Sequence, residues 1–275
     1  MSLLVIIVSY NFERWLDKCL GSLRASLQPV DVLVVDNGSQ DNTVARIERD
    51  YPEVRLVKNG RNIGFGQANN IGLRIAVEEG YDAVFLQNQD SEIEPETIGV
   101  LYRHLHTLPD CGILSPVHLT GDGKGIDEAF EQYTAFQECR SQAPVIPATF
   151  INAAFWMIST DVIRRVGEFS PRFHMYGEDK DYVNRLHHAG YCIAYCQESF
   201  ARHDRQDRRP TRDFFFRKEE AYLLSELTNP VYSRPRAFAY SVLAAVKKSL
   251  IALLHGKGSN ALRYLSIARR LTLQL

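Results

Sequence analysis

The chain has 275 residues, of which 45% are hydrophobic and 24% are charged, and its formal net charge is −1 at pH 7. This length and composition fit one large globular domain with a small appendage, and they exclude a generally polycationic nucleic-acid binder. The charge is unevenly distributed, because residues 229–275 contain eight Lys and Arg but no Asp or Glu. A basic tail of this kind predicts an anionic partner.

Cysteine usage and the N-terminus predict the compartment. Five cysteines occur at irregular spacing without a CxxC pair, so we expect reduced, mostly buried thiols in a cytoplasmic protein. The chain passes from Met1-Ser2 directly into an apolar strand, which predicts no signal peptide. No apolar run reaches ~18 residues, so no transmembrane helix is predicted.

Strands alternate with helices over the first 90 residues. Short apolar runs predict buried strands at residues 3–8, 32–35, 54–57 and 83–86. Apolar residues at helical spacing predict helices at residues 15–23, 41–49 and 66–75. This alternation predicts an α/β fold with a doubly wound, mostly parallel sheet flanked by helices.

Polar residues follow three of these strands, namely Ser9-Tyr10, Asp36-Asn37 and Asn88 with Asp90. Open α/β sheets bind ligands at this carboxyl edge. A nucleotide fits there, because an aromatic ring can take a base, amides and carboxylates can take a ribose, and Asp90 is an oxygen ligand for Mg²⁺ or Mn²⁺. The structural alternatives are a turn-forming role for Asp36 and a capping role for Asp90. The glycine loop at residues 59–66 matches neither a Walker A motif nor a dinucleotide fingerprint.

The next region gives weaker signals until residue 173. Residues 109–147 are predicted to be an irregular excursion on the acceptor side, residues 148–159 a buried strand or layer, and residues 161–166 a short helix closed by Gly167.

A helix is then predicted from Glu178 and Asp179 to about residue 188. The helix dipole keeps carboxylates of a first turn ionised, so Asp179 is a candidate general base. Asp181 is expected to pair with Arg185, its i+4 neighbour. After a strand at residues 191–195, residues 201–210 are expected to form a charged loop. This loop is either a solvated segment or a cover for the sheet edge that brings His203 to a metal and arginines to phosphates.

Taken together, residues 3–228 resemble the family-2 glycosyltransferases, which have the GT-A fold. The resemblance rests on six stretches that occur in the order of the family's motifs: Val8-Ser9-Tyr10-Asn11, Val34-Val35-Asp36-Asn37-Gly38-Ser39, Asn62-Ile63-Gly64-Phe65-Gly66 with Asn69, Gln87-Asn88-Gln89-Asp90-Ser91, Tyr176-Gly177-Glu178-Asp179-Lys180-Asp181-Tyr182, and His203. The nearest subgroup is the bacterial rhamnosyltransferase-like enzymes. Their metal motif often reads L-D-Q-D-S, and Asn88 replaces its first acid here.

The resemblance implies an inverting, metal-dependent transfer of a sugar, with rhamnose as one candidate. The donor would be a dTDP- or UDP-linked sugar, and the acceptor a hydroxyl of a glycan or lipid-linked molecule in cell-surface polysaccharide synthesis. It assigns Asp179 as the base with Glu178 beside it, and Asp90 and His203 as ligands of Mn²⁺ or Mg²⁺. The donor nucleotide would be bound by Ser9, Tyr10, Asp36, Asn37, Asn62, Gly64, Asn69 and Asn88. We assign Arg205 and Arg208 to the phosphates, and Trp156 and Tyr176 to the acceptor.

Two other functions compete with this one. A nucleotidyltransferase would need a glycine- and lysine-rich signature near the first strand, and residues 9–12 offer neither. A non-catalytic nucleotide-sugar-binding module is the second alternative, and Asn88 is the residue that motivates it.

The predicted boundary places a catalytic domain at residues 1–228 and a basic helical tail at residues 229–275. One apolar stripe at helical spacing runs through the tail, and Lys247 and Lys248 interrupt it, so we do not expect it to span a bilayer. The stripe consists of Ala239, Val242, Leu243, Val246, Leu250, Leu253 and Leu254. A break at residues 256–259 precedes a second helix. This hairpin either packs on the catalytic domain or on a second subunit as a homodimer, or lies peripherally on the anionic inner face of the cytoplasmic membrane.

Overall fold

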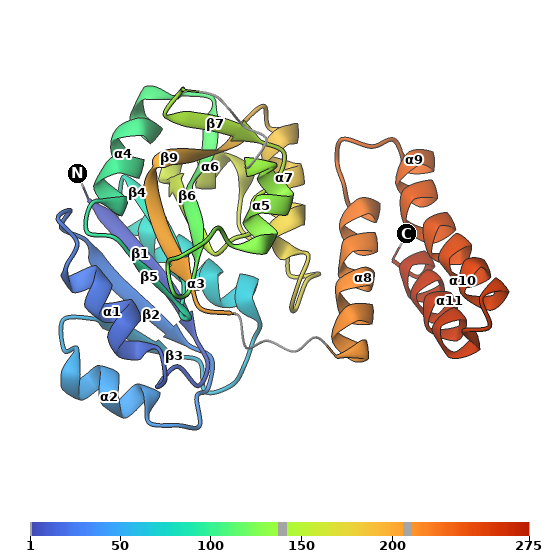
Figure 1. Cartoon of the computed structure of the whole chain (residues 1–275), viewed down its shortest axis with the longest axis horizontal. Coiled ribbons are helices and arrows are strands. Elements are labelled where there is room, and N and C mark those ends of the chain that lie inside the picture. The colour runs from blue at the N-terminus through green and yellow to red at the C-terminus, as the bar shows by residue number, and fades with distance from the viewer. Residues whose placement is uncertain (1, 137–141, 206–210, 275) are drawn as a thin grey trace.

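The computed structural model describes residues 2–136, 142–205 and 211–274, and a mixed nine-stranded sheet forms its centre (Figure 1). The strands follow the order β3-β2-β1-β4-β8-β6-β9-β5, and β7 pairs with β9. Their bounds are β1 Leu3–Ser9, β2 Asp31–Asp36, β3 Arg55–Lys58, β4 Ala83–Asn88, β5 Ser91–Ile93, β6 Cys111–Thr120, β7 Val145–Ala148, β8 Phe155–Ser159 and β9 Cys192–His203. The helices are α1 Leu16–Arg24, α2 Thr43–Asp50, α3 Phe65–Glu78, α4 Thr97–Thr107, α5 Glu128–Thr134, α6 Thr160–Val166, α7 Glu178–His188, α8 Arg212–Leu227, α9 Arg234–Phe238, the π-helical turn η2 Ala239–Leu243, α10 Ala244–Leu254 and α11 Gly258–Thr272.

The N-terminal half of the sheet is parallel, as predicted. β1 pairs in parallel with β2 and β4, and β2 pairs in parallel with β3. The second half is mixed, because β8 runs antiparallel to both β4 and β6 while β6 and β9 are parallel. The carboxyl ends of β1, β2 and β4 therefore meet at one edge.

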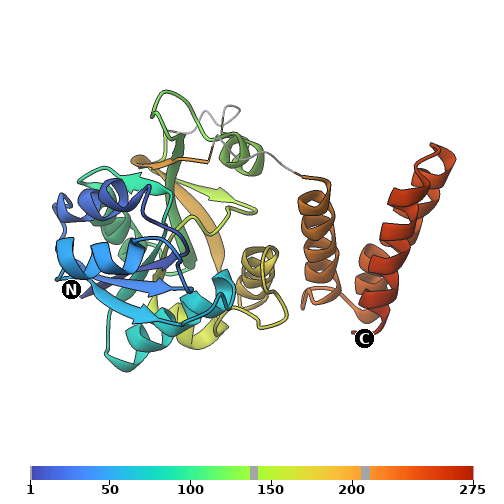
Figure 2. The same cartoon turned by 90° about the horizontal axis from the view of Figure 1, so that it is seen from below.

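Helices cover both faces of the sheet (Figures 1 and 2). Side chains of a strand alternate between its faces, so Leu3, Val5 and Ile7 join one core with α1, α2 and α4, while Leu4 and Ile6 join the other with α3, α6 and α7. A fully buried aliphatic side chain contributes about 1.5–3 kcal/mol to stability. These two clusters hold the polar edge in place.

The prediction of an irregular excursion at residues 109–147 is wrong. The segment contains β6, a central strand of ten residues, as well as α5 and β7. Pro116 interrupts the apolar pattern of β6. Proline also argues against a central strand, because it cannot donate a ladder hydrogen bond. The strand accommodates it at a register shift between Pro116 and Val117, where β9 leaves three residues unpaired with β6.

β9 is longer than predicted. It was expected at residues 191–195 and extends to His203, where β5 and the end of β6 pair with it. His203 therefore lies on the sheet and not in a charged loop. The predicted helix at α7 is confirmed, including the Asp181–Arg185 ion pair at 2.9 Å. Cys19, Cys111, Cys192 and Cys196 are free thiols.

The C-terminal helices form a separate layer beside α7 (Figure 2). α8 packs against α7 and also shares an apolar cluster with η2, α10 and α11. The predicted break between two tail helices is confirmed at residues 255–257. The boundary at residue 228 stays a prediction, and α8, on its N-terminal side, packs with the tail helices.

The buried face of the tail differs from the predicted stripe. Small residues such as Ala245, Ser249 and Ala252 are buried, whereas Leu250 and Leu254 are exposed. The helix at residues 234–254 is also long and apolar enough to cross a membrane by length and composition alone, with a third of its most apolar window buried in the fold. The sequence pattern did not indicate this, because Lys247 and Lys248 interrupt the apolar run.

Candidate active site at the carboxyl edge of the sheet

The ends of β1 and β2 are joined by the Asp36 carboxylate. Asp36 is 2% exposed and accepts hydrogen bonds from the hydroxyls of Ser9 at 3.0 Å and Ser39, and from the amides of Gly38 and Ser39 at 3.0 Å each. These contacts are the turn-forming role that the sequence left open for Asp36. Ser9 is also fully buried, so both residues support the carboxyl edge of the sheet from beneath.

Asn37 connects this edge to the glycine loop. Its side-chain amide donates to the Gly64 carbonyl at 3.3 Å, and Asn62 accepts from the Gly64 amide at 2.9 Å. Gly64 has a φ of +89°, and a Cβ atom there would lie 2.1 Å from the His174 carbonyl oxygen. Only glycine fits this approach, so the loop that follows β3 is held against the segment that precedes α7.

Tyr10 is the exposed aromatic side chain of this edge. Its ring is 45% exposed, while its backbone exchanges two hydrogen bonds with the Gln89 side chain, at 2.8 and 3.1 Å. Gln89 thereby ties the end of β1 to the turn after β4. Asn69, by contrast, is buried within α3 and donates to the Phe65 carbonyl at 3.0 Å, so it braces the helix from within.

The structure brings Asp90 and His203 together. The distance from Asp90 Oδ1 to His203 Nε2 is 3.3 Å, and Asn88 Nδ2 lies 3.3 Å from the same ring nitrogen. Two ligands at right angles on one Mg²⁺, each at about 2.0–2.1 Å, are about 3 Å apart. Nδ1 of His203 is buried and has no hydrogen-bond partner among the described residues. Asp90 and His203 therefore have the spacing and chemistry to hold one divalent ion.

His203 is held from behind by aromatic rings. Phe155 contacts it edge to face at 5.8 Å, and His118 of β6 contacts Phe155 at 4.9 Å. Burial lowers the pKa of His118 well below its usual value, so this ring is neutral. Its Nε2 lies 2.9 Å from the Ser115 hydroxyl. The sequence did not indicate His118, because β6 was not recognised as a strand.

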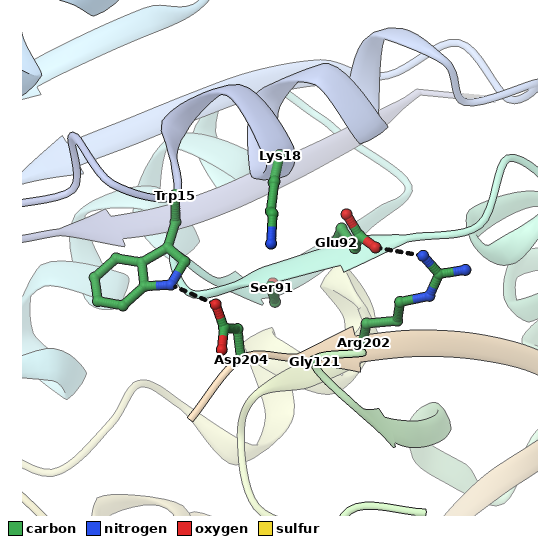
Figure 3. A pocket seen from close by; sticks show the side chains of 7 residues that line it. All are labelled: Trp15, Lys18, Ser91, Glu92, Gly121, Arg202 and Asp204. Atoms are coloured by element: carbon green, nitrogen blue, oxygen red, sulfur yellow. Dashed lines mark hydrogen bonds and ion pairs between the residues drawn. The ribbon is translucent and has the colours of Figure 1, made fainter. Parts of the chain in front are cut away.

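A second connection fixes the end of β9 beside Asp90. The Asp204 amide donates to the Asp90 carbonyl at 2.7 Å, and the Asp204 carboxylate accepts from Trp15 Nε1 at 3.0 Å. Figure 3 shows this contact from α1 next to the Glu92–Arg202 ion pair. The cavity between them is about 10 Å³, which is room for one water molecule and not for a substrate.

Glu178 and Asp179 open α7, as predicted. Burial and the neighbouring Asp179 charge raise the pKa of Glu178, whose Oε2 has no hydrogen-bond partner among the described residues. Burial also raises the pKa of Asp179, but the amides of Lys180 and Ala153 oppose this shift. The two carboxyls titrate together, and the amides favour the state in which Glu178 is protonated and Asp179 is anionic.

A short backbone segment connects the two halves of the site. The Asn88 amide donates to the Ala154 carbonyl at 3.0 Å, and the preceding residue, Ala153, provides an amide to Asp179. Two adjacent residues therefore contact the metal-motif end and the carboxylate of α7. Residues 153 and 154 thus link the strand that leads to Asp90 with the start of α7.

Aromatic residues near Asp179 were missed by the sequence analysis. The Asp179 charge contributes to the raised pKa of Tyr133, whose main cause is burial, and the Tyr133 ring contacts Phe150 at 4.8 Å. Lys180 Nζ lies 5.2 Å from the Phe150 ring centre. These residues come from α5 and from the turn before β8, two regions in which no site residue was predicted.

Tyr176 precedes the carboxylate pair in the chain, and its predicted role as an acceptor residue stays a prediction. It adopts a φ of +69°, which is strained for tyrosine, and its ring contacts Phe214 of α8 at 5.3 Å. The next residue, Gly177, approaches the Ala221 carbonyl of α8 so closely that a Cβ atom would lie 2.9 Å from it. α8 therefore supports the loop that carries Tyr176.

Two predicted site residues need correction. Trp156 is fully buried between Phe169 and Tyr182, and its Nε1 donates to the Ile151 carbonyl at 3.2 Å, so it does not face an acceptor. The Arg205 guanidinium is bound in a bidentate ion pair by Asp127, which caps α5, and it is not available to a phosphate in this arrangement. Arg208 lies outside the described residues.

A different group of side chains that could bind a metal lies between α4, which carries His104, and β9, which carries Cys196 and Glu198. His104, Cys196 and Glu198 offer three ligand atoms within 4.8 Å of one another, and they are the one such group among the described residues. His104 Nε2 and Glu198 Oε2 already form a contact at 3.0 Å. A substitution in this group can therefore serve as a control in experiments that test metal binding by Asp90 and His203.

Three comparisons extend these observations. The sequence model described as Glycosyl transferase family 2 matches residues 4–204. An N-acetylglucosaminyl-diphospho-decaprenol L-rhamnosyltransferase of Mycobacterium tuberculosis is 28% identical over 221 residues, which cover 70% of this chain and 72% of that protein.

Two solved structures share the fold. S. aureus TarS 1–349 in complex with UDP-GlcNAc has a TM-score of 0.63 and 16% identity, covering 98% of this chain and 83% of TarS 1–349. Mannosyltransferase PcManGT from Pyrobaculum calidifontis, in complex with GDP-Man and Mn²⁺, has a TM-score of 0.64 and 17% identity, covering 98% and 84% of the two chains. The predicted GT-A fold with a C-terminal helical region is confirmed.

Proposed function

The chain belongs to glycosyl transferase family 2 and is a glycosyltransferase, and we propose that it transfers a hexose with inversion in a metal-dependent single displacement. The donor is a nucleotide-diphosphate sugar, dTDP- or UDP-linked, with rhamnose as the first candidate. The acceptor is a hydroxyl of a glycan or a lipid-linked glycan in cell-surface polysaccharide synthesis.

One observation carries this proposal. Adjacent residues of one segment contact Asn88 through the Ala154 carbonyl and Asp179 through the Ala153 amide. A donor diphosphate held near Asp90 would therefore have its sugar close to a carboxylate. Single displacement needs this order, in which leaving group, sugar and base follow one another along a line.

Asp90 and His203 would hold Mn²⁺ or Mg²⁺, as their 3.3 Å separation and the oxygen and nitrogen donors allow. When bound, the ion would offset the negative charge of the donor diphosphate. The neighbour from P. calidifontis is described with Mn²⁺, which supports this assignment. Asn88 offers an amide where a carboxylate is usual, so this site has one negative charge less.

Residues of α7 and of the carboxyl edge of the sheet carry out the remaining steps. Asp179 takes the proton of the acceptor hydroxyl as that oxygen forms its bond to the anomeric carbon. The bond from this carbon to the diphosphate oxygen breaks, and the nucleotide diphosphate leaves with the electron pair. Glu178 is protonated beside Asp179, so the two carboxyl groups together carry one negative charge before the proton is taken up. Tyr10 offers its exposed ring to the base. Asn62 and Gly64, in the loop that Asn37 anchors, and Asn88, at the end of β4, bind the rest of the nucleotide. Tyr176 contacts the acceptor.

The relative from M. tuberculosis supports both substrate classes. Its name specifies transfer of L-rhamnose to a decaprenol-linked diphosphate sugar. A lipid-linked acceptor would place this enzyme at the cytoplasmic face of the membrane, with the tail as a peripheral contact. The neighbour TarS, described with UDP-GlcNAc, supports a pyrimidine nucleotide in the donor.

A donor screen tests the proposal. The protein is incubated with Mn²⁺ and a panel of dTDP-, UDP- and GDP-sugars, and free nucleotide diphosphate is measured with and without a polyprenyl-diphosphate-GlcNAc acceptor. We expect one donor to be consumed, and to be consumed faster when the acceptor is present. The anomeric configuration of the product should be opposite to that of the donor. Binding of a nucleotide sugar without any release of diphosphate would instead favour the non-catalytic module. Retention of configuration would refute the single displacement.

A further inference from the structure

The tail helices leave a large apolar surface uncovered. The helix at residues 234–254 and α11 expose several large apolar side chains each, and we call this set the outer apolar surface: Tyr240, Leu243, Leu250, Ile251, Leu253, Leu254, Leu262, Leu265 and Leu273. Leu254 is 87% exposed and Leu262 is 69% exposed. Clusters of this kind on a soluble protein mark a contact with a protein or a membrane.

The opposite side of these helices is already occupied. Val242 and Ala245 pack into the cluster with α8, and the Ser249 hydroxyl donates to the Ala261 carbonyl of α11 at 2.9 Å. Lys248 forms an ion pair with Glu219 of α8. The helix at residues 234–254 therefore has one face committed to α8 and α11 through apolar contacts, a hydrogen bond and an ion pair, and crossing a bilayer would require it to leave them.

The charges within the outer apolar surface favour one kind of partner. Leu243, Lys247, Leu250 and Leu254 follow one another at helical spacing, as do Leu262, Leu265, Arg269 and Leu273. Lys247 and Arg269 are exposed and form no ion pair with the described residues, whereas Arg263 and Arg270 pair with Asp213 and Glu220 of α8. A partner that covers these stripes must therefore provide an anion for the cation in the middle of each one.

A second copy of this tail cannot supply that anion, because residues 229–275 contain no Asp or Glu. Stacking two outer apolar surfaces would cover Lys247 and Arg269 in an apolar contact without an anion from either tail, which is unfavourable. A bilayer with anionic headgroups supplies both an apolar interior and negative charge at its surface.

We infer that the outer apolar surface seats the enzyme on an anionic bilayer, with Leu250 and Leu254 among the residues that enter the headgroup layer. This inference rests on the proposed function, since that function uses a lipid-linked acceptor. α8 would transmit the seating to the site, because it packs on α7 and contacts Tyr176 through Phe214. The lipid surface would thus hold the acceptor loop in place.

Vesicle flotation of the full-length protein tests the inference. We expect it to float with phosphatidylcholine vesicles that contain about one third phosphatidylglycerol, and not with pure phosphatidylcholine. The double variant Leu250→Asp/Leu254→Asp should lose at least about tenfold in binding, because it places two charges in the apolar layer. Leu27→Asp, on an exposed leucine of the catalytic domain that is 71% exposed, is the matched control and should bind normally. Lys247→Gln and Arg269→Gln should each weaken binding about fivefold, the factor for ~1 kcal/mol per lost charge.

Donor hydrolysis with soluble nucleotide sugar, measured in the same preparations, separates this inference from the proposed function. The Leu250→Asp/Leu254→Asp variant should hydrolyse the donor like the wild type. Normal hydrolysis without any binding to anionic vesicles would overturn the inference alone. A dimer in solution that this variant converts to a monomer, with no vesicle binding, would assign the surface to a second copy. Vesicle binding without turnover of any donor would count against the proposed function and not against the lipid contact.

Discussion

The Asp90 carboxylate and the His203 imidazole meet at 3.3 Å although they enter the site from different strands, one after β4 and the other at the end of β9. β5 pairs Ser91 with His203 in antiparallel register, so the sheet itself sets this distance. Because the two proposed metal ligands are held on paired strands, their positions are fixed, and changes at either residue should have measurable effects.

Removal of either residue should weaken metal binding. Asp90→Asn and His203→Ala should each raise the apparent Kd for Mn²⁺ in the transfer reaction at least about tenfold, because one of two protein ligands is lost. EDTA should abolish wild-type activity and Mn²⁺ should restore it. His104→Ala, in the other group of ligating side chains, is the matched control. Full wild-type activity in excess EDTA would show that the reaction needs no divalent ion.

Asp179→Asn should lower kcat by roughly 10²–10⁴-fold while donor affinity stays within a few fold, because the amide cannot take a proton. Glu178→Gln should keep most of the activity, since a glutamine resembles the protonated glutamic acid in size and charge. Donor affinity is measured by isothermal titration and kcat at saturating acceptor. The opposite order of the two variants would assign the base to Glu178.

Glu178 should make stability fall as pH rises. Its pKa is raised in the folded protein, mainly by burial, so its protonated form contributes stability fully below the ordinary value of 4.5, and this contribution is lost as the pH rises through the raised value. Glu178→Gln carries no such charge. The Tm of Glu178→Gln should therefore exceed that of the wild type by several degrees at pH 8.5, and the difference should shrink towards pH 5. A Tm difference that stays constant across this pH range would refute the raised pKa of the buried Glu178 carboxyl.

The sequence was sufficient where one element carried its own pattern. The buried strands β1, β2 and β4 and the helix α7 follow from apolar runs and from Glu178 and Asp179 at a helix start. The strand β6 was not predicted because Pro116 breaks its apolar pattern. Only the bulge in the neighbouring strand β9 explains how β6 continues past this proline.

Contacts between distant segments could not be predicted in the same way. The sequence suggested Trp156 as an acceptor residue from its chemistry, but its ring fills the core, and the placement of a side chain on one face or the other depends on register. Arg205 was similarly misjudged, since its partner Asp127 lies in a segment that was expected to be irregular. Tyr133 lies within the electrostatic influence of Asp179 only through the folding of that same segment, and Phe150, from the turn before β8, contacts Tyr133.

Gly64→Ala should disrupt the glycine loop. Its φ of +89° with a ψ of 162° is almost unique to glycine, and an added Cβ would collide with the His174 carbonyl oxygen. We expect a loss of about 3 kcal/mol or more in the free energy of unfolding, together with loss of donor binding. Gly60→Ala is the control, because that glycine also has a positive φ, +68°, but has open space around its Cβ position. It should cost only about 1–2 kcal/mol. Equal effects of the two variants would mean that the contact with residue 174 is unimportant.

Asn88→Asp should restore an acid to the metal motif and change the metal dependence of the protein. The side chain lies 3.3 Å from His203 Nε2, on the same side as Asp90, so a carboxylate there would add a negative charge next to the ion. Without metal, two carboxylates near each other repel, and the variant should have a lower Tm than the wild type in EDTA. With Mn²⁺ the order should reverse, because the ion offsets both charges and binding stabilises the folded state.

Thermal unfolding with and without saturating Mn²⁺ measures this reversal directly, and a titration should show an apparent Kd for Mn²⁺ at least about tenfold lower than in the wild type. Asn88→Ala is the matched control, since it removes the amide without adding charge and should gain no more stability from Mn²⁺ than the wild type does. If Asn88→Asp is less stable than the wild type at every Mn²⁺ concentration, the side chain at position 88 does not face the ion. Asn88 would then serve the donor ribose or the orientation of His203, and the metal would depend on Asp90 and His203 alone.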